Sequence, residues 1–93
     1  MTDDLIREVW GKGSVVLGND QNLWRKDQCG AWIGRQFYGN RNSQYGWEVD
    51  HIDTNTENNQ LSNLRPLQWK NNASRQDERL TCPVRSSGIN NIE

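Results

Sequence analysis

Two short stretches decide the fold: GWEVDHI at residues 46–52 and LSNLRPLQWKNN at residues 61–72. Side chains in the first stretch partly alternate, with Trp47, Val49 and His51 on one face, which predicts a strand. In the second stretch, residues 64–67 predict a short strand, and Pro66 indicates that it is an edge strand or contains a bulge. It then continues into residues that favour a helix. The predicted order is therefore strand, loop, strand and helix.

The neighbouring residues set the bounds of these elements. Residues 53–60 hold Asp, Thr, Asn and Glu with no apolar anchor, which predicts a loop. Residues 64–67 predict the second strand, and residues 69–79, rich in Lys, Asn, Ala, Arg, Gln and Glu, predict the helix. Pro83 ends any helical extension. Residues 86–93 have few apolar anchors, which predicts a loose tail.

The first half of the chain predicts short strands. β-Branched residues cluster at residues 14–17, which favours a strand. Residues 24–27 and 31–34 are expected to pair as a hairpin, and residues 38–43 form a polar connector rich in turn formers. Residues 5–10 are amphipathic, and their pattern leaves helix and strand both open.

The composition predicts a small core. At 93 residues the chain forms one domain at most. Only 32% of the residues are hydrophobic, and the mean hydropathy is -1.04. The five Trp residues are expected to supply much of the core rather than to stack on bases, because large aromatic rings bury the most area per residue.

Charge and cysteine content narrow the function classes. The formal net charge of -1 gives no global basic signal for nucleic acid, although a local basic face would suffice. Cys29 and Cys82 belong to no CxxC pair, which excludes a four-cysteine zinc site within the chain. No run is apolar and long enough for a membrane span or a leader, so the expected location is cytoplasmic. The thiols are then expected to be reduced, since disulfides are rare in that compartment.

Asp50 and His51 are side chains suited to phosphodiester hydrolysis. An imidazole can remove a proton from water, and one divalent cation can stabilise the developing charge and the leaving oxygen. Asp50 is a hard oxygen ligand suited to Mg²⁺ or Mn²⁺. Neighbouring strand residues face opposite ways, so the two side chains converge only if the backbone bends at the strand end. Asn71 and Asn72 are candidates for a second ligand, and either could instead cap the helix. Glu48 is expected to be a solvated strand residue on the same face as Asp50.

Residues 45–78 resemble the HNH nuclease family, whose core is a ββα-metal finger. The family pattern has a strand ending in Asp-His, matched by Asp50 and His51, and a second strand that starts with Asn-Leu, matched at Asn63. A helix then carries the last His of the pattern, and Asn72 stands in that place. The resemblance implies an α+β fold with a ββα-metal (HNH/His-Me finger) core and an N-terminal β-hairpin extension.

The resemblance also implies a single HNH-like domain over residues 1–93. Residues 1–44 would be a β-rich N-terminal extension, and residues 45–80 would be the ββα-metal core. Residues 86–93 would be the loose C-terminal tail.

The family roles carry over one residue at a time. His51 would be the general base, and Asn63 would join the catalytic set by holding the loop that aims it. Asp50 and Asn72 would ligate the metal. An amide oxygen is acceptable to Mg²⁺ or Mn²⁺ and poor for Zn²⁺, so the HNN pattern implies one of the first two cations.

The resemblance implies no structural zinc, since Gln68 and Asn71 stand where one of the family's zinc-binding cysteine pairs would be. Phosphate contacts are expected from five basic side chains: Arg41, Arg65, Lys70, Arg75 and Arg79. Phosphate contacts carry no sequence information. The expected partner is therefore DNA, most readily double-stranded and bound with little sequence specificity, and the protein is expected to be a monomer or a weak homodimer.

The resemblance thus implies a metal-dependent endonuclease that hydrolyses DNA phosphodiester bonds. One alternative is a catalytically inactive nucleic-acid-binding module on the same fold, for which the missing last His would be the sign. Another is a protein-interaction domain, which only the near-neutral charge supports.

Overall fold

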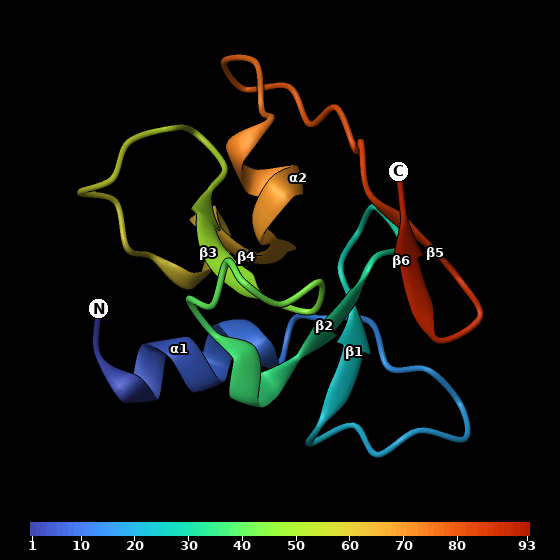
Figure 1. Ribbon diagram of the computed structural model, residues 1–93. Helices are drawn as coiled ribbons and strands as arrows, with labels where there is room; N and C mark the ends of the chain where they lie inside the picture. Colours follow the sequence, from blue (N-terminus) through green and yellow to red (C-terminus); the bar gives the residue numbers. More distant parts are fainter.

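The computed structural model describes residues 1–93 and contains three two-stranded antiparallel sheets with two α-helices (Figure 1). Both element types are present in separate parts of the chain, which agrees with the predicted α+β class. No helix has the length and apolar content needed to cross a membrane. The elements follow the order α1 (Asp3–Trp10), β1 (Trp24–Lys26), β2 (Trp32–Gly34), β3 (Trp47–His51), β4 (Leu64–Gln68), α2 (Trp69–Ala73), β5 (Arg85–Ser87) and β6 (Asn90–Ile92), with 3₁₀ turns at Arg35–Phe37 and Leu61–Asn63.

The predicted strand, loop, strand and helix are all present as β3, residues 52–63, β4 and α2. β3 and β4 pair antiparallel, with Trp47 opposite Gln68 and His51 opposite Leu64. Pro66 lies opposite Val49 within β4. A proline is tolerated there because both strands of a two-stranded sheet are edge strands. This agrees with the edge strand or bulge that the proline predicted.

The helix α2 is shorter than predicted, since it ends at Ala73 rather than at residue 79. Beyond it, Gln76 and Arg79 exchange backbone hydrogen bonds across a tight turn in which Asp77 has a φ of 56°. Asn, Ser and Asp offer the backbone local alternatives to helical hydrogen bonds, and several of them occur in this segment. Arg75 and Arg79 therefore lie beyond the helix on which they were predicted.

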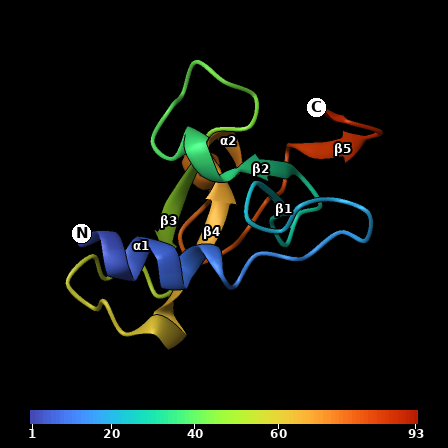
Figure 2. The ribbon, with the colours of Figure 1, turned by 90° about the horizontal axis from the view of Figure 1, so that it is seen from below.

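The core lies between α1 and the sheet of β3 and β4. Residues 5–10, left open by their pattern, lie in helix α1, whose first turn is capped by the Thr2 hydroxyl accepting from Leu5 N at 3.2 Å. Trp10 packs on Trp47 with ring centroids 5.3 Å apart. Figure 2 shows α1 running across β3 and β4. The remaining members of the buried cluster are Val9, Ile33 and Leu64.

The first half of the chain agrees only in part with its pattern. The hairpin is confirmed, since β1 and β2 pair antiparallel with Trp24 opposite Gly34. The predicted strand at residues 14–17 is wrong: Ser14 makes one isolated bridge to Lys26, and the residues that follow pair with nothing. A β-branched run forms a strand only where a partner strand is within reach.

The C-terminal residues form a hairpin, β5–β6, rather than the predicted loose tail. Three hydrogen bonds attach it to Trp32 of β2. The Asn91 side chain accepts from Trp32 N at 2.7 Å and donates to Trp32 O at 3.0 Å, and the Trp32 indole donates to Gly88 O at 2.6 Å. A tail with few apolar anchors is therefore held by hydrogen bonds to a strand that lies 59 residues earlier.

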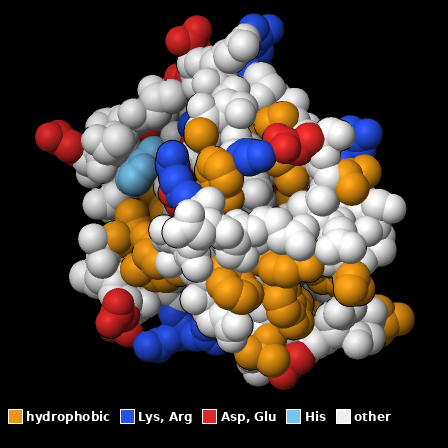
Figure 3. All heavy atoms as spheres, in the orientation of Figure 1, with side chains coloured by type: hydrophobic (Ala, Val, Ile, Leu, Met, Phe, Trp, Pro, Cys, Tyr) orange, Lys and Arg blue, Asp and Glu red, His pale blue; other side chains and the backbone are white.

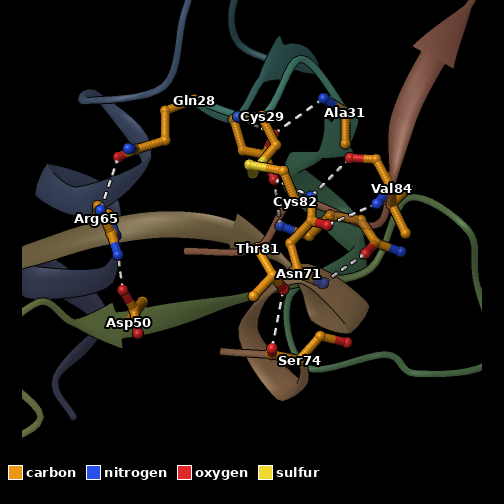
Figure 4. Close-up of a disulfide and its surroundings, with 12 residues drawn as sticks. Gln28, Cys29, Ala31, Asp50, Arg65, Asn71, Ser74, Thr81, Cys82 and Val84 are labelled. Atoms are coloured by element: carbon orange, nitrogen blue, oxygen red, sulfur yellow. Dashed lines mark hydrogen bonds and ion pairs between the residues drawn. A yellow bond between two sulfur atoms is a disulfide. The ribbon is translucent and has the colours of Figure 1, made fainter. Parts of the chain in front are cut away.

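The expectation of reduced thiols is also contradicted, because Cys29 and Cys82 form a disulfide (Figure 4). The turn between β1 and β2 lies against the segment that follows α2, and this places the two Cα atoms 5.3 Å apart. The pair is separated by 53 residues, so no local spacing pattern could reveal it.

Candidate metal and catalytic site

A cavity of about 320 Å³ lies between the end of β3, the following loop and α2. Four predicted site residues line it: Asp50, His51, Asn72 and Arg75. The space-filling view shows the single histidine at the surface beside a basic side chain (Figure 3). The fold thus brings together a carboxylate, an imidazole and an amide that come from two different elements.

His51 makes one side-chain contact, from Nε2 to Asn59 Oδ1 at 2.8 Å. An amide oxygen only accepts, so this contact pairs it with a protonated Nε2. In the neutral imidazole with that tautomer, Nδ1 has the lone pair that a base needs. Asn59 lies in the polar loop, where nothing in the pattern distinguished it from its neighbours.

Asn63 holds the loop that follows β3. Its Oδ1 accepts from Asp53 N at 3.0 Å, and its Nδ2 donates to Asp53 Oδ1 at 2.8 Å and to Asn58 O at 2.9 Å. Its backbone carbonyl also accepts from Ile52 N at 2.8 Å. The pKa of Asp53 is lowered by hydrogen bonds, first from the Asn55 backbone and then from side chains that include Asn63. Asn63 therefore fixes the loop start immediately after His51 without entering the cavity.

Asp50 is buried, with 3% of its surface exposed, and two guanidinium groups share its carboxylate. Arg65 Nε donates to Oδ2 and Arg75 Nη1 donates to Oδ1, both at 2.6 Å. Figure 4 shows Arg65 lying between Asp50 and Gln28. Both oxygens of the predicted metal ligand are thus engaged within the protein.

Arg75 and Arg65 were predicted to contact phosphates, but both side chains are directed into the protein. The Arg75 side chain is only 8% exposed and also donates to the carbonyls of His51 and Ile52, at 2.8 and 2.9 Å. Its Nε is buried without a partner. The Arg65 side chain is 13% exposed and is directed inward in the same way. Both arginines therefore pair with groups of the protein itself, because the buried Asp50 carboxylate needs compensating positive charge.

The remaining predicted phosphate contacts are exposed. Lys70 pairs with Glu93 at 2.8 Å, and Arg79 is an exposed residue of the turn beyond α2. Arg41 donates to both oxygens of Glu48, at 2.7 and 2.8 Å, from an exposed side chain. Three of the five basic residues can therefore reach a ligand outside the protein.

The structure decides between the two asparagines at the start of α2. Asn71 is fully buried and faces away from the cavity, where it bonds Asp27 and both backbone groups of Val84. Asn72 lines the cavity, and its Nδ2 donates to Glu48 Oε1 at 2.8 Å. Neither caps the helix, because the Gln68 side chain accepts from the backbone N–H groups there. Successive helical residues point about 100° apart, so only one of them can face the site.

Glu48 is more than the solvated strand residue that was expected. Its carboxylate accepts from Arg41 and Asn72 together, and the side chain is 21% exposed. The hydrogen bond from Arg41 is the main cause that holds the pKa of Glu48 below its ordinary value of 4.5, and Asn72 adds to it. The sequence did contain a signal for this contact, because Glu48 stands two residues before Asp50 and therefore on the same strand face.

The oxygen donors in the cavity fit a hard divalent cation. Among the residues that line the cavity, Asp50 has a carboxylate and Asn72 an amide oxygen, which are ligand types that such a cation accepts. No group of three His, Cys, Asp or Glu side chains comes together anywhere in the chain. Two protein ligands are compatible with Mg²⁺, which keeps several waters and takes substrate phosphates. Because Arg75 Nη1 donates to Asp50 Oδ1 at 2.6 Å, a cation bound to that oxygen would compete with Arg75.

A model of the HNH endonuclease family matches residues 31–73, a segment that runs from the start of β2 to the end of α2. No curated protein and no solved structure gave a match. The matched segment contains the cavity residues Asp50, His51 and Asn72. Residues 31–73 of this chain are thus similar to the HNH endonuclease family, and this similarity points to nuclease activity in general.

Proposed function

We propose that the protein is a metal-dependent endonuclease that hydrolyses phosphodiester bonds in double-stranded DNA, with β3, β4 and α2 acting as a ββα-metal finger. The observation that carries the proposal is the meeting of Asp50, His51 and Asn72 at one cavity, inside the segment that matches the HNH family. These residue types supply a base and two hard oxygen ligands.

His51 would act as the general base. Its Nδ1 takes a proton from a water molecule that attacks phosphorus, while Asn59 Oδ1 accepts the hydrogen of Nε2 at 2.8 Å. That contact fixes the tautomer and helps to stabilise the imidazolium that forms. Asn63 keeps the loop start in place, so that the ring and its partner remain aligned.

Asp50 and Asn72 would hold the cation at the wall of the cavity. When bound, a divalent ion would stabilise the negative charge that develops on the phosphoryl oxygens and on the leaving oxygen. Arg75 must release Asp50 Oδ1 for this, and its guanidinium then becomes available to a backbone phosphate beside the cavity.

The exposed basic side chains would bind the DNA backbone. Arg41, Lys70 and Arg79 extend from the connector before β3, from α2 and from the turn beyond it. Contacts to phosphates position a duplex without reading its bases, so little sequence specificity follows. Because the net charge of the protein is -1, DNA binding would depend strongly on these exposed basic side chains and on the bound cation.

The test is nicking of supercoiled plasmid by the wild type and by His51→Ala, each with Mg²⁺, Mn²⁺ or EDTA. We expect cation-dependent nicking, and a fall of about 10²–10⁴-fold in the variant, which is the usual contribution of a general base. Circular dichroism checks that both proteins are folded. Equal rates for the two proteins would refute the role of His51.

A second candidate is a nucleic-acid-binding module without catalysis. The observation in its favour is that both oxygens of Asp50 already accept from arginines at 2.6 Å. A folded wild type that binds duplex DNA in a salt-dependent manner, but nicks plasmid with neither cation, would support this module over the nuclease.

A further inference from the structure

We propose that Glu48, held by Arg41, is a positioning residue that turns the amide oxygen of Asn72 toward the cavity. This proposal rests on the proposed function, in which Asn72 is a ligand of the cation. It adds a chain of three side chains, Arg41–Glu48–Asn72, that runs from the connector loop through β3 to α2.

The first step concerns the amide of Asn72, whose two ends are nearly alike in shape. An ionised carboxylate only accepts hydrogen bonds, so the end that faces Glu48 Oε1 at 2.8 Å must be Nδ2. The oxygen end is then directed away from Glu48. Asn72 lines the cavity and no protein group donates to its Oδ1, which leaves that oxygen free for a ligand.

The second step concerns how Glu48 is held. Arg41 donates to both of its carboxylate oxygens, at 2.7 and 2.8 Å. A bidentate guanidinium contact fixes the plane of a carboxylate as well as its position. Arg41 therefore keeps Glu48 Oε1 in place to accept from Asn72, without touching Asn72 itself.

The third step separates Glu48 from the ligands themselves. Its Oε1 accepts from both Arg41 and Asn72, and its Oε2 accepts from Arg41. Glu48 does not line the cavity, whereas Asp50, two residues along the same strand face, does. Groups that orient a metal ligand in this way commonly change affinity by about 10–100-fold when they are removed.

The connector that carries Arg41 is held close to β3. Gly46 has no room for a side chain, since a Cβ would lie 1.8 Å from Asn40 O. The Trp69 indole donates to Ser43 O at 3.0 Å, and the Arg41 guanidinium lies 5.7 Å from the Trp69 ring. These contacts keep Arg41 within reach of Glu48, although its side chain is exposed.

The experiment measures the affinity of the metal-free protein for Mn²⁺ alone by electron paramagnetic resonance. Glu48→Gln is compared in the wild type and in the Asn72→Ala background. A glutamine can present either end of its amide, so the orientation of Asn72 is released. We expect Glu48→Gln to weaken Mn²⁺ binding about tenfold in the wild type and to have no further effect without Asn72. Glu57→Gln, the same change on the exposed loop, is the matched control.

Each other outcome has a distinct meaning. An equal loss in both backgrounds shows that Glu48 acts through its charge alone and overturns the positioning role. Unchanged affinity in Glu48→Gln, with weaker binding in Asn72→Ala, overturns positioning and leaves the metal site standing. Unchanged affinity in Asn72→Ala overturns the proposed ligand, and positioning with it.

Arg41→Met provides a second test that does not alter Glu48 itself. Removal of a positive charge near the site would by itself tighten Mn²⁺ binding. Loss of the hydrogen bonds that hold Glu48 would weaken it. Weaker binding supports the positioning chain, and unchanged or tighter binding overturns the part assigned to Arg41. Because Arg41 is exposed, this variant is expected to fold even if Glu48→Gln does not.

Discussion

Asp50 is the residue on which the site depends, and two arginines hold it. A buried carboxylate needs compensating charge, and Arg65 and Arg75 provide it at 2.6 Å each. Arg65 is the cross-strand partner of Asp50 in the β3–β4 pairing, so it is fixed by the sheet. Arg75 comes from the irregular segment after α2. Of the two, Arg75 is therefore the one that we expect a cation to displace.

Arg75→Gln is therefore expected to bind Mn²⁺ more tightly than the wild type, by about tenfold, which corresponds to ~1.4 kcal/mol. The variant should also melt at a lower temperature without metal, because Asp50 keeps only one cationic partner. Mn²⁺ titration and thermal melts give both values. Arg79→Gln, an exposed arginine four residues along, is the control. Tighter binding in neither variant would mean that Arg75 does not compete with the cation.

At the scale of the element, β3 has two faces with different tasks. Trp47 packs on Trp10 in the core, while Glu48 and Asp50 meet residues from α2 and from the segment beyond it. The alternation of a strand places the last two on one face. The fold lowers the pKa of Glu48, chiefly through the hydrogen bond from Arg41.

The sign of the pH dependence follows from that lowered pKa. The hydrogen bond from Arg41 favours the carboxylate, so its stabilisation is present above the ordinary value of 4.5 and is lost as the pH falls through the lower value in the fold. We expect the difference in melting temperature between the wild type and Glu48→Gln to shrink as the pH falls below 4.5. Melts from pH 7 to pH 2 test this, and a constant difference would contradict it.

At the scale of the whole molecule, distant segments hold β3, β4 and α2 in place. The disulfide joins the β1–β2 turn to the segment after α2. Asp27, buried in that turn, accepts from the backbone N of Gln68 and from the Asn71 side chain, both at 3.0 Å. The N-terminal hairpin therefore fixes the start of α2 and, through it, the wall of the cavity.

Replacement of both cysteines by serine should lower the free energy of unfolding by about 4 kcal/mol. This is the stabilisation expected when a cross-link closes a long loop and so reduces the chain entropy of the unfolded state. The sequence separation is 53 residues. Urea melts of the oxidised wild type, the reduced wild type and the double variant measure the effect. The reduced protein and the double variant should agree, and stability equal to that of the oxidised form would show that the disulfide does not brace the fold.

The order of β3, loop, β4 and α2 followed from the sequence, since strand alternation and loop composition are local properties. The sequence also singled out Asp50, His51 and Asn72 as candidates, because their spacing along the chain resembles the family pattern. Long-range packing determined which of Asn71 and Asn72 faces the cavity, and that Arg75 is directed inward rather than to solvent.

The disulfide and the C-terminal hairpin were likewise decided by the tertiary structure. Both depend on contacts between residues more than 50 positions apart, such as Cys29 with Cys82. A local pattern reports the conformation that a segment prefers, and it contains no information about which distant segment will pack against it. That choice comes from burial and hydrogen bonding in the folded chain, where buried polar groups such as Asp27 must find partners.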